Sequence, residues 1–155
     1  MKPSVEEQIL FPALNSKKIH LIPDLLDNVF SLTGSDLAHW YGIDETGDVV
    51  CRKAKGIFRS SSCDSDAPWI EFIVDCRELL VQNTRENKVF PELLLHKKMQ
   101  SALVCPIILE GLFTEIILLN SLQSNHFGQD LLNKTEEFRT YASMVLRDRP
   151  QENNE

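Results

Sequence analysis

The sequence predicts an α+β fold in which helices flank a mainly antiparallel β-sheet of five to six strands and a long helix comes last. Two pairs of apolar runs, each joined by a short turn, predict two β-hairpins. Segments with helical periodicity precede, separate and follow these hairpins, an order typical of α+β proteins. With 155 residues, of which 43% are hydrophobic, the chain fits one domain with its own hydrophobic core.

The first long helix is predicted to begin at Pro23, because proline suits the first turn of a helix. It runs to Leu32 with one apolar face, and Gly34 ends it. That face consists of Ile22, Leu25, Leu26, Val29 and Phe30.

The first hairpin follows directly. Residues 37–44 predict a strand, in which the neighbours Trp40 and Tyr41 point to opposite faces. A turn at Thr46 and Gly47 leads into a returning strand at 48–56.

The middle of the chain predicts a polar loop at 59–67, a helix at 69–78, a short strand at 79–84 and a helix at about 90–98. The polar composition of the first segment is typical of a loop. The helix that follows Pro68 has its apolar residues on one face; they are Trp69, Ile70, Ile73 and Val74.

The second hairpin pairs 101–110 with 112–121, and Glu110 and Gly111 form its turn. Pro106 lies inside the first of these strands, so we expect an edge, a bulge or a strand end there. Asp130 then opens the last helix, which runs to about Asp148.

A set of residues within the second hairpin and before the last helix stands in a characteristic order: Ser101, Pro106, Gly111, Asn120, Phe127 and Asp130. In this order the C-terminal half of the chain resembles that of a GAF domain, a small ligand-sensing module of signalling proteins. The order of elements also matches that family across residues 22–148. We therefore expect a GAF-like domain at 22–148, an N-terminal extension at 1–21 and a polar tail or linker at 149–155.

The resemblance implies a ligand cavity between one face of the sheet and the segment 57–91. The side chains that could line it are Trp40, Trp69, Phe72, Ile73, Asn83, Thr84, Phe90, Leu94 and Cys105. Most of these side chains are apolar and a few can anchor a polar group, the usual composition of small-molecule sites. A large residue at Cys105 would then fill the cavity at little cost in stability. The alternative is that the same side chains form ordinary core.

Two ligand classes known for GAF domains fit poorly. Cyclic-nucleotide binders carry Asn-Lys, and later a Phe that three residues separate from Asp-Glu. Here Ser121 follows Asn120, and only two residues separate Phe127 from Asp130. Bilin binders pair a cysteine with a neighbouring histidine, and no cysteine of this chain has such a neighbour. The identity of any cofactor therefore stays unknown.

Charge and cysteine spacing exclude further classes. A net charge of -7 disfavours nucleic-acid binding, which needs a basic face. No run is long and apolar enough to predict a membrane span. The four cysteines show no Cys-x-x-Cys spacing, which disfavours a metal site, and we expect a cytoplasmic location.

The function that this sequence predicts is non-enzymatic: a sensory or regulatory domain that binds a small molecule or mediates dimerisation in signal transduction. A homodimer through the two terminal helices is expected, together with a downstream effector domain. One alternative is an interaction module without a ligand. Another is a thiol-dependent free methionine sulfoxide reductase, which acidic residues beside Cys63 disfavour.

Overall fold

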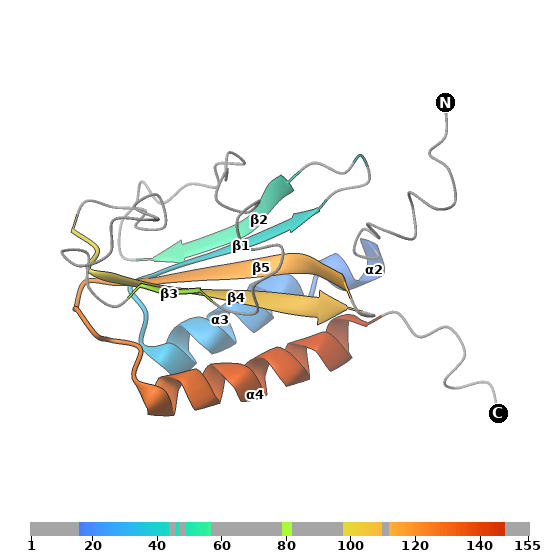
Figure 1. The fold of residues 1–155 in the computed structure, drawn as a ribbon. Coiled ribbons are helices and arrows are strands. Elements are labelled where there is room, and N and C mark those ends of the chain that lie inside the picture. Colours follow the sequence, from blue (N-terminus) through green and yellow to red (C-terminus); the bar gives the residue numbers. More distant parts are fainter. Residues whose placement is uncertain are drawn as a thin grey trace.

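A computed structural model describes residues 16–43, 46, 49–56, 79–81, 98–109 and 112–147. In these ranges the chain forms a five-stranded antiparallel sheet with strand order β2-β1-β5-β4-β3. Two long helices, α3 and α4, lie side by side under one face of the sheet (Figure 1). The predicted α+β fold is thus confirmed.

Apart from α2, which the sequence did not predict, the described helices and strands follow the predicted order. Their bounds are α2 (Ser16–Ile19), α3 (Ile22–Thr33), β1 (Leu37–Ile43), β2 (Val49–Gly56), β3 (Leu79–Val81), β4 (Ser101–Leu109), β5 (Leu112–Ser121) and α4 (Gln129–Leu146). The helix predicted at 69–78 and nearly all of the one at 90–98 lie outside the described residues. Gly34 caps α3 with φ of 61°, a left-handed conformation that glycine adopts without strain.

Strand β5 is the centre of the sheet, because it pairs with β1 on one side and with β4 on the other. Ile117 aligns with Trp40 of β1 and with Cys105 of β4. Leu109 aligns with Leu112, so the connection between β4 and β5 has the predicted two-residue length. Glu110 and Gly111 themselves lie outside the described residues.

Pro106 lies where the sequence requires it, beyond the end of a neighbouring strand. Among the described residues, β3 pairs with Ala102–Val104 of β4, so no described strand continues the hydrogen-bond ladder beside Pro106 on that side. Helix α4 covers this stretch instead. Arg139 Nε donates to the carbonyl of Pro106 over 2.9 Å, and Ser143 Oγ donates to that of Ile108 over 2.8 Å.

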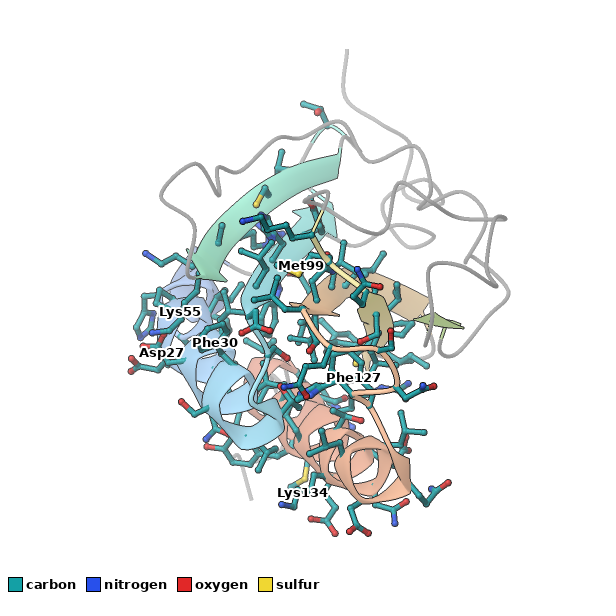
Figure 2. The ribbon with its side chains drawn as sticks, turned by 90° about the vertical axis from the view of Figure 1, so that its left-hand side faces the viewer. Asp27, Phe30, Lys55, Met99, Phe127 and Lys134 are labelled. Carbon is teal, nitrogen blue, oxygen red and sulfur yellow. The ribbon has the colours of Figure 1, made fainter. Side chains whose placement is uncertain are left out.

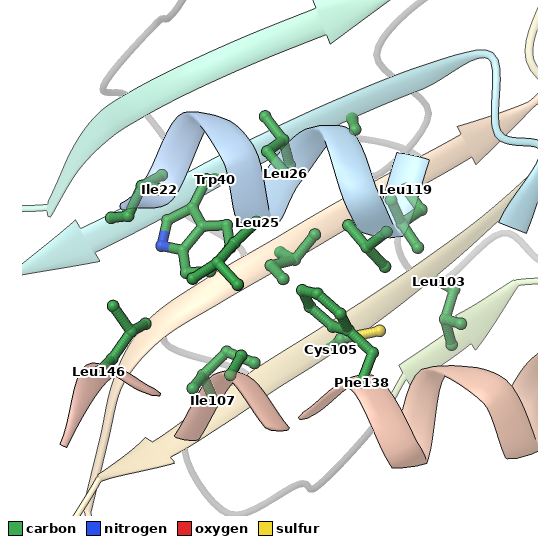
Figure 3. Close-up of a cluster of buried hydrophobic side chains, with 14 of the residues drawn as sticks. Ile22, Leu25, Leu26, Trp40, Leu103, Cys105, Ile107, Leu119, Phe138 and Leu146 are labelled. Carbon is green, nitrogen blue, oxygen red and sulfur yellow. The ribbon is translucent and has the colours of Figure 1, made fainter. Parts of the chain in front are cut away.

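The hydrophobic core lies between the sheet and the helix pair. Its side chains come from α3, β1, β4, β5 and α4 (Figure 3). They include Ile22, Leu26, Ala38, Trp40, Leu103, Cys105, Ile107, Ile117, Leu119, Phe138, Ala142 and Leu146. The main apolar faces of α3 and α4 are therefore buried inside the protomer.

The loop between β5 and α4 is bonded to the end of α3 and to the residue that precedes β1. Asp36 Oδ2 accepts from the backbone N–H of Leu122 over 2.8 Å, and His126 Nε2 lies 2.7 Å from the carbonyl of Thr33. Phe127 is fully buried in the core (Figure 2). In the Phe-x-x-Asp pattern, Phe127 is therefore a core residue that fixes the chain just before α4 begins.

Replacing Cys105 with Phe should destabilise the protein. Cys105 is only 1% exposed and packs in the helix-side core, where added volume costs about 1–3 kcal/mol. Urea denaturation measures the loss, and Cys105→Val is the matched control because it changes volume little. An unfolding free energy equal to that of the wild type would show that this core holds a void.

Candidate functional site

The two faces of the sheet are set by the alternation of side chains along its strands. Ala38 and Trp40 of β1 and Ile117 and Leu119 of β5 belong to the core beneath the sheet. Their neighbours in sequence therefore point to the other face. We call this the distal face, and its side chains are Leu37, His39, Tyr41, Ala102, Val104, Ile116, Leu118 and Asn120.

The distal face is buried, although α3 and α4 lie on the other side. Every one of its side chains is at most 3% exposed. Polar groups stand among the apolar ones. The rings of His39 and Tyr41 stack with their centroids 6.1 Å apart at 15°, and Asn120 is completely buried. A buried apolar surface with a few polar groups is the usual composition of a small-molecule site.

The nine residues expected to line a pocket divide into two groups. Trp40 and Cys105 are described, and both lie in the core beside α3 and α4 rather than on the distal face (Figure 3). The other seven lie outside the described residues: Trp69, Phe72, Ile73, Asn83, Thr84, Phe90 and Leu94. On β1 and β4 it is their neighbours, Tyr41 and Val104, that reach the distal face.

A second polar cluster lies on the helix side of the sheet, in a position that the sequence did not indicate. The carboxylate of Glu115 accepts two bonds from Arg52, of 2.8 Å from Nε and 2.9 Å from Nη2. Trp40 Nε1 also donates to it over 2.7 Å. The side chains of Glu115 and Arg52 are 0% and 9% exposed.

Gly42 makes room for this cluster. A Cβ atom built at this position would lie 2.2 Å from Nε of Arg52, so any larger residue would displace the guanidinium. The three side chains join β2, β1 and β5, which are adjacent in the sheet. Because the hydrogen bonds of Glu115 join it to Arg52 and Trp40 within the cluster, we assign the cluster a structural role.

Burial raises the pKa of Glu115 above its ordinary value of 4.5. The hydrogen bond and charge of Arg52, and the hydrogen bond from Trp40, act in the opposite direction. Desolvation is the larger effect, because a carboxylate loses its hydration when it enters the core.

The two described cysteines, Cys51 and Cys105, differ in state. Cys105 is a buried thiol that is not part of a disulfide. Cys51 of β2 is disulfide-bonded, and its partner lies outside the described residues. Structural disulfides are typical of oxidising compartments and rare in the cytoplasm. The disulfide at Cys51 therefore does not support the cytoplasmic location, which stays a prediction.

Among the described residues, no cluster of His, Cys, Asp and Glu side chains could hold a metal ion. No helix among the described residues is long and apolar enough to cross a bilayer.

The fold is that of a GAF domain. Similar solved structures include the PixJ GAF domain of Thermosynechococcus elongatus in its blue-light absorbing form, with a TM-score of 0.67, 13% identity and 84% of each chain covered. A GAF domain/HD domain protein from Geobacter sulfurreducens matches with a TM-score of 0.63 at 14% identity, covering 84% of this chain and 92% of that one.

One similar structure is an enzyme. The type II free methionine-R-sulfoxide reductase from Thermoplasma acidophilum matches with a TM-score of 0.66 at 11% identity, covering 84% of this chain and 92% of that one. No family model and no curated protein matches the sequence. These likenesses therefore establish the fold, and the structural neighbours are mostly sensory domains of signalling proteins.

The raised pKa of Glu115 predicts a pH dependence of stability. In the folded state the carboxyl keeps its proton above pH 4.5, whereas the unfolded chain has released it. The contribution of Glu115 to stability is thus full below pH 4.5 and is lost as the pH rises through the folded pKa. The unfolding free energy of the wild type minus that of Glu115→Gln should accordingly fall over this range.

Urea denaturation at a series of pH values measures this difference. In the background of Arg52→Leu the fall should extend to higher pH, because the guanidinium no longer stabilises the carboxylate. A difference that rises with pH would mean that the ion pair outweighs burial.

Proposed function

We propose that this protein is a non-enzymatic sensory domain of the GAF type, which binds a small molecule against the distal face of its sheet. The observation that carries the proposal is the group of buried polar side chains His39, Tyr41 and Asn120 on an otherwise apolar face. The likeness to sensory GAF domains supports the class. Ligand binding at the distal face would change the interaction of this domain with a partner or effector domain.

The chemistry of this face suggests the kind of ligand. Ala102, Val104, Ile116 and Leu118 provide an apolar floor, which favours a molecule with substantial apolar surface. The imidazole, phenol and amide can together donate and accept hydrogen bonds, so the ligand should carry a polar group near β1. In this proposal Trp69, Phe72, Ile73, Asn83, Thr84, Phe90 and Leu94 form the remainder of the wall.

Native mass spectrometry of protein purified from its own host tests the proposal. We expect a fraction with added mass that organic solvent releases as a small molecule. Tyr41→Phe and Asn120→Leu should lower this fraction, because each removes a group that can hydrogen-bond the ligand. Tyr141→Phe is the control, since this tyrosine lies exposed on α4.

If the purified protein carries no added mass under gentle ionisation, the ligand-binding proposal fails. The alternative of an interaction module without a ligand would then take its place. Added mass that survives both distal-face substitutions would place the ligand elsewhere.

The disulfide at Cys51 supports a second candidate function, dithiol chemistry. A reductase of this fold exists among the similar structures, and a sulfoxide is reduced when two thiols become a disulfide and water leaves. Turnover of free methionine sulfoxide by a thioredoxin system, present in the wild type and lost in Cys51→Ser, would establish it. Unchanged turnover in that variant, or none in the wild type, would exclude a role for this cysteine.

A further inference from the structure

The disulfide-bonded Cys51 lies on the distal face of the sheet, next to Tyr41. The two residues are directly opposite each other in the register of β1 and β2, and side chains at such positions share one face with Cβ atoms about 4.5–5.5 Å apart. A bulge opposite Trp40 leaves Arg52 outside the register, and its guanidinium reaches Glu115 on the helix side. The sulfur of Cys51 therefore stands beside a phenol of the proposed ligand site.

The disulfide partner of Cys51 can be narrowed to two residues. The chain has four cysteines, and Cys105 is not part of a disulfide. The bond therefore joins Cys51 to Cys63 or to Cys76, which both stand between β2 and β3 in the sequence. These two strands form opposite edges of the five-stranded sheet. The disulfide thus ties an edge strand to the chain that connects the two edges.

The position of Cys51 favours thiol–disulfide exchange, because the residue is partly exposed and belongs to an edge strand. In such an exchange one thiolate of a dithiol attacks a sulfur of the bond, and the other sulfur leaves as a thiolate. The second thiolate of the dithiol then releases the mixed disulfide. The protein gains two electrons and two protons as two thiols, while the dithiol becomes a disulfide. The Cys51 sulfur lies 3.6 Å from the carbonyl oxygen of Lys53, so the new thiol has an acceptor nearby.

Ligand binding and the oxidation state of Cys51 are coupled through the strand pair β1 and β2. The stacked rings of His39 and Tyr41 lie on β1, and the disulfide is anchored on β2 directly across from Tyr41. A covalent tie at this point holds the site in its binding geometry, which reduces the ordering that binding requires. The oxidised form should therefore bind the ligand more tightly. By linkage, the bound ligand should make the disulfide harder to reduce by the same factor.

We propose that the Cys51 disulfide is a redox switch of the distal-face site: the oxidised protein binds its small molecule, and reduction of the bond by a dithiol weakens that binding. This inference rests on the ligand binding proposed above and adds its regulation. It differs from the second candidate function in its chemistry. No sulfoxide is consumed, and a low-molecular-weight disulfide such as oxidised glutathione restores the bond by the reverse exchange.

Binding measured in both redox states of the full chain tests the switch. The probe is the small-molecule fraction that organic solvent releases from protein purified from its host. It is titrated onto oxidised protein and onto protein reduced with dithiothreitol. We expect the Kd to rise at least about fivefold on reduction, the lower end of typical coupling between sites. Cys51→Ser should bind weakly with or without dithiothreitol, whereas the control Cys105→Val should respond like the wild type, because it keeps the disulfide.

The outcomes separate the two proposals. Equal affinity in both states would overturn the switch and leave ligand binding intact, whereas no binding in either state would overturn both. Alkylation with iodoacetamide in denaturant checks the starting state. Two of the four cysteines should react before reduction and all four after it; four reactive cysteines at the start would contradict the switch. So would loss of the folded circular dichroism spectrum on reduction, because the disulfide would then be purely structural.

Discussion

The rest of the structure depends on the burial of both faces of β5. This strand lies between β1 and β4, and every side chain from Glu115 to Ser121 is at most 1% exposed. One face is covered by α3 and α4, which bury Ile117 and Leu119. The other face, with Leu118 and Asn120, is equally buried. A central strand of this kind forces the protein to keep two separate interior layers, and each layer can serve a different purpose.

The two layers treat polar groups differently. On the helix side Glu115 is neutralised by Arg52 and receives a further bond from Trp40. An ion pair held in this way resists any other partner, because separating it would leave a charge in the core. On the distal side the polar side chains of His39, Tyr41 and Asn120 stand among apolar neighbours. The helix-side layer is therefore suited to rigidity and the distal layer to recognition, while α4 exposes its outer surface beyond both.

Local signals in the sequence predicted the elements well, because they depend on neighbouring residues. Gly34 marked the end of α3, and Pro106 marked a point on β4 where, among the described residues, only β5 pairs with the strand. The face on which Trp40 and Cys105 lie could not be derived, since alternation separates two faces without saying which one the helices cover. The Glu115–Arg52 pair spans 63 positions, and no local pattern connects two such residues. The exposure of Tyr141 likewise depends on how α4 packs.

The central claim is that ligand recognition belongs to the distal face and that the helix side is solid core. Methyl NMR tests it directly, because β4 and β5 place matched probes on the two faces: Val104 and Leu118 on the distal face, Leu103 and Leu119 in the core. A small-molecule extract of the host is added to the labelled protein. The account predicts that the resonances of Val104 and Leu118 shift while those of Leu103 and Leu119 stay in place. Shifts confined to the core probes would contradict it.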